Sequence, residues 1–126
     1  NRDAIFEEVP KKLVRAYTGS DGESHLEVRS EADFDFVERD NTRTAVEDAT
    51  GVVFAMRPDG YFSDFHNAPR RQYVLYLACS VEIGLGDGSS MVMEPGDVLL
   101  AEDTSGRGHS SRVIKGGICA FVRLEK

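Results

Sequence analysis

The sequence predicts an all-β domain with little helix. From residue 51 onward, short runs rich in β-branched and aromatic residues recur about every 8–12 residues, the spacing typical of a β-sandwich or barrel. Glycine, proline and aspartate separate these runs, and such residues favour tight turns. Helix signals are scarce: we expect only one turn or short helix around Asp3–Glu8, ended by Pro10.

The N-terminal part contributes two expected strands and a long polar connection. Lys12–Thr18 and Ser24–Arg29 are predicted strands, and the second alternates in the manner of a half-buried strand. The segment 19–22 ends in Asp-Gly, which favours the positive φ angles of a hairpin turn. Residues 30–50 are polar and mixed, so we expect a loop that contains one short strand.

Turn residues become regular in the rest of the chain. Gly-Asp-Gly at 86–88 and Pro-Gly-Asp at 95–97 are typical turn sequences. The expected strands are Gly51–Arg57, Gln72–Ala78, Val81–Leu85, Met91–Met93, Val98–Ala101, His109–Ile114 and Ile118–Leu124. Because no repeat or low-complexity linker interrupts them, we expect one domain over residues 1–126.

Composition excludes several classes of partner. The 126 residues are 40% hydrophobic and 29% charged, the balance of an ordinary globular chain with one core. A net charge of −7 without a basic stripe argues against a nucleic-acid partner. The longest apolar runs span only a few residues, far short of the roughly 20 that cross a bilayer, so we expect no membrane partner.

The two cysteines indicate a reducing compartment. Cys79 and Cys119 both lie in apolar, strand-like runs, where cysteine is usually a buried free thiol. Nothing else argues for the oxidising environment that a disulfide requires, and no leader pattern is visible at the start of the chain. We therefore expect a cytoplasmic protein.

Residues 60–109 carry spaced glycines and histidines. The run GYFSDFHNAPRRQ at 60–72 resembles the first cupin motif, with Gly60 and His66 at its glycine and first histidine. Ala68 stands where the second histidine belongs, and Gln72 stands where the glutamate belongs. Further on, the run GRGH, which ends at His109, resembles the core of the second cupin motif.

The chain thus resembles a subgroup of small single-domain cupins, most strictly over residues 60–113. This resemblance implies a double-stranded β-helix, or jelly-roll, barrel with a pocket inside. In cupins the motif residues converge on one divalent metal ion, and imidazole and carboxylate ligands suit Fe, Mn, Ni or Zn. Here the resemblance leaves His66, His109 and the amide of Gln72, with His25 as a candidate replacement ligand or general base. Metal binding and metal-free acid/base use of the histidines both stay open.

Strand parity selects further pocket residues. Gln72 and Tyr76 share the face that the motif turns inward, and Tyr76 is a candidate catalytic hydroxyl or a packed aromatic. Phe54 and Met56 share a face of their own strand, and we expect both to line the pocket. With His109, these residues would form a mostly apolar pocket with a few polar groups, as small-molecule sites usually are.

Charged residues near the motif have two interpretations each. Arg71 or Arg107 would receive a substrate carboxylate or phosphate, or would be solvated partners of nearby acidic residues. The pair Glu102-Asp103 has two interpretations, acid/base chemistry on the one hand and turn capping or pairing with a loop arginine on the other. We favour the second.

The sequence therefore predicts a pocket that binds and converts a small organic metabolite. This metabolite would be anionic if an arginine binds it. His66 and His109 would move protons, as in an isomerase, lyase or cyclase, with or without a weakly held metal. The alternative is a non-catalytic binding protein. We also expect a homodimer, because Gln72–Ala78 is apolar on both faces.

Overall fold

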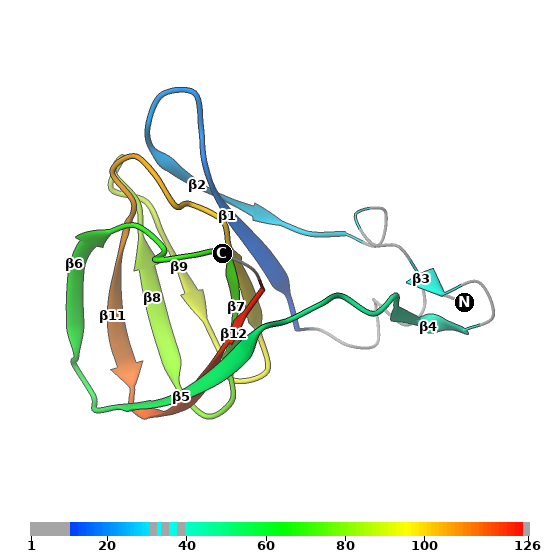
Figure 1. Ribbon diagram of the computed structural model, residues 1–126. Helices are drawn as coiled ribbons and strands as arrows, with labels where there is room; N and C mark the ends of the chain where they lie inside the picture. Colours follow the sequence, from blue (N-terminus) through cyan, green and yellow to red (C-terminus); the bar gives the residue numbers. More distant parts are fainter. Residues whose placement is uncertain (1–10, 31–32, 34–35, 38–39, 125–126) are drawn as a thin grey trace.

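The computed structural model describes residues 11–30, 33, 36–37 and 40–124. These residues form two facing β-sheets and one short hairpin, with almost no helix, so the all-β prediction is confirmed (Figure 1). The turn or helix expected around Asp3–Glu8 lies outside the described residues. No helix in the described part of the chain combines the length and apolar character that crossing a membrane requires.

Three sheets contain all the described strands. The strands are β1 (Leu13–Thr18), β2 (Ser24–Val28), β3 (Phe36–Val37), β4 (Asp40–Thr44), β5 (Gly51–Arg57), β6 (Phe62–His66), β7 (Gln72–Tyr76), β8 (Ser80–Gly84), β9 (Ser90–Met93), β10 (Val98–Ala101), β11 (His109–Lys115) and β12 (Gly117–Arg123). The six-stranded sheet has the order β2-β1-β10-β7-β12-β5, and the four-stranded sheet has the order β6-β11-β8-β9. The hairpin β3-β4 lies to one side of the two large sheets (Figure 1).

Antiparallel pairing dominates, with one parallel pair among the described strands. β1 and β10 run parallel, in a register that places Val14 beside Leu99. β7 then pairs antiparallel with both β10 and β12, so it occupies the middle of the six-stranded sheet. Because β7 is central, its inward side chains are well positioned to form the floor of a site between the sheets.

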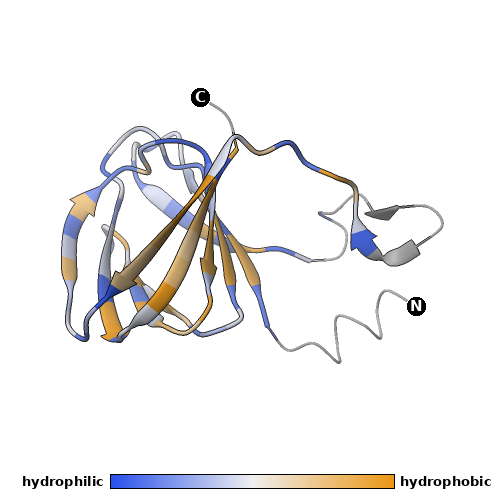
Figure 2. Ribbon diagram, turned by 60° about the horizontal axis from the view of Figure 1, so that its bottom comes forward, coloured by the Kyte–Doolittle hydropathy of each residue, from blue (hydrophilic) through white to orange (hydrophobic). Residues whose placement is uncertain are grey.

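The hydrophobic core lies between the two large sheets. Both sheets contribute fully or almost fully buried side chains, among them Val14, Tyr76, Ile83, Met93 and Leu99. Figure 2 shows that several long strands of the two large sheets are mainly hydrophobic, whereas many of the connecting loops are hydrophilic. The two cysteines, Cys79 and Cys119, are buried free thiols, as expected.

Most expected strands are present, and the differences concern short polar segments. β6 was not predicted as a strand, because Phe62–His66 mixes polar and aromatic residues and is mostly exposed. The polar connection 30–50 contains the two strands of a hairpin, β3 and β4, where one short strand was expected. β6 matters for the site, because its last residue is His66.

Candidate functional site

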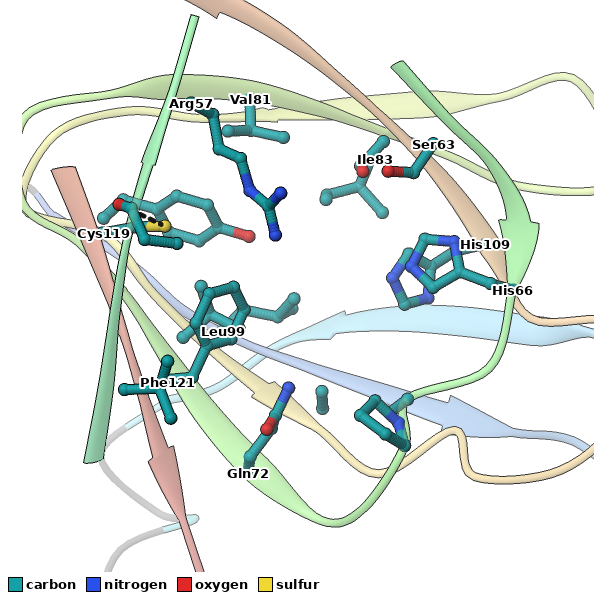
Figure 3. Close-up of a pocket in the computed structure, with 18 of the residues that line it drawn as sticks. Arg57, Ser63, His66, Gln72, Val81, Ile83, Leu99, His109, Cys119 and Phe121 are labelled. Carbon is teal, nitrogen blue, oxygen red and sulfur yellow. Dashed lines mark hydrogen bonds between the residues drawn. The ribbon is translucent and has the colours of Figure 1, made fainter. Parts of the chain in front are cut away.

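A cavity of about 440 Å³ opens between the two large sheets (Figure 3). Its lining comes from β5, β7, β10 and β12 on one side and from β6, β8 and β11 on the other. Most lining side chains are aliphatic or aromatic, with a few polar and charged groups among them. This volume is in the range of small-molecule sites, which typically measure about 300–1,000 Å³.

Two histidines lie side by side on the wall of this cavity. His66 ends β6, His109 begins β11, and the two residues are partners in the antiparallel register. Their ring centroids are 4.8 Å apart, with the ring planes inclined at 56° (Figure 3). Gly108 permits this approach: its φ is +81°, and a Cβ on it would overlap the carbonyl oxygen of His66.

A buried carboxylate orients His109. Nδ1 of His109 lies 2.6 Å from Oδ2 of Asp103, and Oγ of Ser24 donates to the same oxygen at 2.7 Å. Burial raises the pKa of Asp103, but the hydrogen bonds from His109 and from the Ser24 hydroxyl outweigh it, so the pKa lies below its usual value. Because the carboxylate is ionised and can only accept, Nδ1 carries a proton, and in the neutral ring Nε2 keeps its lone pair.

His66 is held in the same tautomer by the backbone. Its Nδ1 lies 2.7 Å from the carbonyl oxygen of Asp64, which can only accept a hydrogen bond. Nδ1 therefore carries the proton, and Nε2 of His66 is also left as an acceptor. Unlike His109, which is buried, His66 is solvent-exposed. The cavity wall thus carries one buried and one exposed imidazole, and Nε2 is the acceptor nitrogen in the neutral form of each ring.

The inner face of β7 supplies two other predicted residues. Gln72 and Tyr76 are 7% and 4% exposed, and both line the cavity. The amide of Gln72 points into the cavity (Figure 3). Burial raises the pKa of Tyr76, so its phenol stays protonated and is a hydrogen-bond donor rather than a base.

The prediction that Phe54 and Met56 line the pocket is wrong. They are 59% and 78% exposed and lie on the outer face of β5. The inner face of the same strand carries Val53, Ala55 and Arg57. Apolar character was a poor guide here, because β5 is apolar on both faces and its larger apolar side chains point outward.

Arg71 does not line the cavity, contrary to its predicted role as a substrate ligand. Its Nε donates to Glu102, which also accepts a hydrogen bond from Nε of Arg15 at 2.6 Å. Burial raises the pKa of Glu102, but these two arginines outweigh it and hold the pKa below its usual value. The favoured interpretation of Glu102 as a partner of arginine is therefore confirmed. It does not apply to the neighbouring Asp103, which contacts His109 instead.

Arg107 and His25 also lie outside the cavity lining. The guanidinium of Arg107 stacks over the ring of Phe65, 4.5 Å from its centroid. Nε2 of His25 lies 3.1 Å from both carboxylate oxygens of Asp21 in the neighbouring turn. His25 therefore does not join His66 and His109 in this structure.

Sequence reasoning missed two kinds of residue. Asp103 was considered for acid/base work, but its contact with His109 depends on how the loop between β10 and β11 folds back. Arg57, Arg70 and Arg123 line the cavity and were not selected. The alternation of side chains along Gly51–Arg57 would have placed Arg57 in the cavity if the odd-numbered residues had been assigned to the inner face.

The side chains present do not fit a conventional transition-metal site. Such sites combine three or four imidazole, thiolate or carboxylate ligands. Among the described residues no cluster of three or more histidine, cysteine, aspartate or glutamate side chains is placed to hold a metal ion. Ala68 provides no donor atom, and Asp103 bonds His109 and Ser24 through Oδ2, while its buried Oδ1 has no hydrogen-bond partner among the described residues.

No protein-family model matches the chain, and a search of curated proteins finds no match. The chemistry of the site must be argued from its own residues. These provide an oriented base, a second imidazole at 4.8 Å between ring centroids, and an enclosed space beside them. Such a set can remove a proton from a bound molecule and return one to it.

Proposed function

We propose that this protein is a small cupin-type, jelly-roll enzyme that transfers protons on a small organic molecule. The reaction class is isomerisation, elimination or cyclisation. The motif residues around His66 and His109 and the two facing sheets support the cupin assignment. The contact between Asp103 and His109 carries the catalytic proposal, because a buried carboxylate on Nδ1 is the arrangement that makes Nε2 a general base.

Each residue has a distinct task in this mechanism. Nε2 of His109 takes a proton from the bound molecule, and the ionised Asp103 stabilises the imidazolium that forms. His66, once protonated, delivers a proton at a second position, and solvent exposure allows its proton to be replaced from water. The amide of Gln72 and the hydroxyl of Tyr76 orient the molecule through hydrogen bonds.

Proton transfer can be tested without knowledge of the natural substrate. The protein is incubated in D₂O with a pool of small ketones and keto acids, and exchange at carbon is followed by ¹H NMR. We expect the wild type to accelerate exchange in at least one compound, and His109→Asn to abolish this acceleration. His25→Asn is the matched control, because His25 lies outside the cavity, and it should exchange as the wild type does.

If the protein instead binds its ligand without catalysis, a ligand should bind in the cavity without faster exchange. A compound that binds in the cavity but exchanges no faster than in buffer would contradict the catalytic proposal. Exchange that survives in both His109→Asn and His66→Asn would contradict the assigned roles of these residues.

A further inference from the structure

Three arginines line the cavity, and the described part of the chain adds no acidic side chain to this lining. Arg57, Arg70 and Arg123 belong to the lining, together with His66 and His109. Among the described residues of the lining none is aspartate or glutamate. The whole chain, by contrast, has 22 acidic and 15 basic residues and a net charge of −7. The positive charge of the cavity is therefore opposite in sign to that of the protein.

These arginines differ from other arginines of the chain in their partners. Four arginines outside the cavity form ion pairs with carboxylates, namely Arg15, Arg29, Arg71 and Arg107. Within the part of the chain that the structure describes, Arg57, Arg70 and Arg123 form none. The contact of Arg57 is with the ring of Tyr61, 4.7 Å from its guanidinium. A half-buried cation without a carboxylate beside it favours an anionic ligand.

The arginines occupy both ends of the cavity. Arg57 ends β5 opposite Gly117, whereas Arg123 ends β12 opposite Gly51. Gly51 and Arg57 are the first and last residues of one strand, so their Cα atoms lie roughly 20 Å apart along the sheet, and long arginine side chains can shorten the distance between the charged groups. Arg123 also pairs with Gln72 of β7, and Arg70 is two residues before Gln72 in the chain. Positive charge is thus present at one end from Arg57 and at the other from Arg70 and Arg123.

The histidine pair lies on the sheet that faces Arg57. His66 and His109 belong to β6 and β11, and Arg57 belongs to β5 of the opposite sheet. Figure 3 shows the guanidinium of Arg57 and the two imidazoles directed into the same space. An anionic group held at Arg57 would therefore present the neighbouring carbons of its molecule to the two imidazoles.

We propose that the substrate is an elongated organic acid with a carboxylate at each end. One carboxylate binds the guanidinium of Arg57, and the other binds at Arg70 and Arg123. This inference rests on the proposed function, because it names the substrate class of the same cavity. Arginine suits the task, since its planar guanidinium receives a carboxylate through two parallel hydrogen bonds.

Isothermal titration calorimetry with a defined set of probes tests the proposal. Succinate, adipate and sebacate are dicarboxylates of increasing length, butyrate is the single carboxylate, and dimethyl adipate carries no charge. We expect at least one dicarboxylate to bind about tenfold or more tightly than butyrate, and the diester not to bind. Equal binding of butyrate, tighter binding of inorganic phosphate, or no binding of any dicarboxylate would overturn the proposal.

Variants assign the effect to the cavity arginines. Arg57→Gln should weaken dicarboxylate binding about 10- to 100-fold, since hydrogen bonds to charged groups are worth about 1.5–3 kcal/mol. Arg112→Gln is the matched control: Arg112 is exposed, stacks on the ring of Phe62 and does not line the cavity, so affinity should not change. Arg57→Lys, which keeps the charge, serves if Arg57→Gln does not fold, and it too should bind less tightly than the wild type. Unchanged affinity in the folded Arg57 variants would overturn the assignment.

The same titration separates this inference from the proposed function. His109→Asn should bind the dicarboxylate within a few-fold of the wild type while losing deuterium exchange. If dicarboxylates do not bind but another compound exchanges, the substrate class is wrong and proton transfer stands. If dicarboxylates bind and none exchanges in the wild type, proton transfer is wrong and the anion site stands.

Discussion

Asp103 and His109 form a buried hydrogen-bonded pair, with Oδ2 and Nδ1 only 2.6 Å apart, next to the cavity between the two large sheets. The pair is local in sequence but is completed by Ser24 of β2, whose hydroxyl donates to the same carboxylate oxygen. The carboxylate fixes the ring and its tautomer, and it leaves Nε2 as the ring nitrogen that is not bonded to Asp103 in a residue that lines the cavity.

Asp103→Asn should abolish the basicity of Nε2 while leaving the ring in place. An amide can donate to Nδ1, and the proton of the imidazole then moves to Nε2. We expect the rate of deuterium exchange to fall about 10²- to 10⁴-fold. Stability should fall by about 1–3 kcal/mol, because a hydrogen bond to a buried charged group is lost. Exchange at the wild-type rate in a folded Asp103→Asn protein would contradict the role of the pair.

Gly108→Ala should destabilise the fold and displace His66. The new Cβ would overlap the carbonyl oxygen of His66 at a positive φ, for a cost of about 1–3 kcal/mol in unfolding free energy. Gly88→Ala is the matched control, since Gly88 has a similar φ of +89° but open space around it. Urea unfolding of both variants measures the difference. An equal loss in the two would show that the contact with His66 is unimportant.

Acidic pH should destabilise the protein because it protonates carboxylates that are partly or fully buried. Burial raises the pKa of Asp97, but hydrogen bonds from Lys12 and from the backbone of Glu94 outweigh it, and the net pKa is lowered, as for Glu102 and Asp103. Each of these carboxylates has a lower pKa in the folded protein than in the unfolded chain, where it is about 4. It therefore contributes its full stabilisation of the fold at pH values above about 4, and this contribution is lost as the pH falls through the folded-state pKa.

Urea unfolding at intervals between pH 7 and pH 3 measures this dependence. The free energy of unfolding should change little down to about pH 5 and then fall steadily. Asp97→Asn should be less stable at pH 7 and show a shallower fall, because it lacks one of these groups. A wild-type profile that stays flat to pH 3 would contradict the expectation.

The outer face of β5 should be an interface between two copies of the chain. Val52, Phe54 and Met56 are 54%, 59% and 78% exposed there, beside the apolar residues of β12. A contiguous apolar face of this kind is typical of association surfaces. Light scattering after gel filtration should give the mass of a dimer, and Met56→Lys should shift it to that of a monomer. A monomeric wild type at micromolar concentration would rule this out.

The sequence predicted those parts of the molecule that depend on local chemistry. Turn residues such as Pro95-Gly96-Asp97 marked most strand ends, because backbone preferences act over a few residues. Alternation placed Gln72 and Tyr76 correctly on the inner face of β7, where the motif provided a fixed starting point.

Features that depend on pairing between distant strands were not predictable in this way. The register that sets His66 beside His109 joins residues of two strands far apart in the chain, and β6 itself was missed. The face of β5 was assigned wrongly because hydrophobicity does not distinguish two apolar faces. Arg57 was overlooked for the same reason, since it lies on the face taken to point outward.

The tautomers of the histidines test the central claim most directly. Two-dimensional ¹H–¹⁵N NMR of the imidazole nitrogens at a pH where the rings are neutral distinguishes Nδ1–H from Nε2–H. The structure requires Nδ1–H in both His66 and His109, and Asp103→Asn should convert His109 alone to Nε2–H. A wild-type His109 protonated at Nε2 would contradict the account, because no lone pair would then face the cavity to accept a proton.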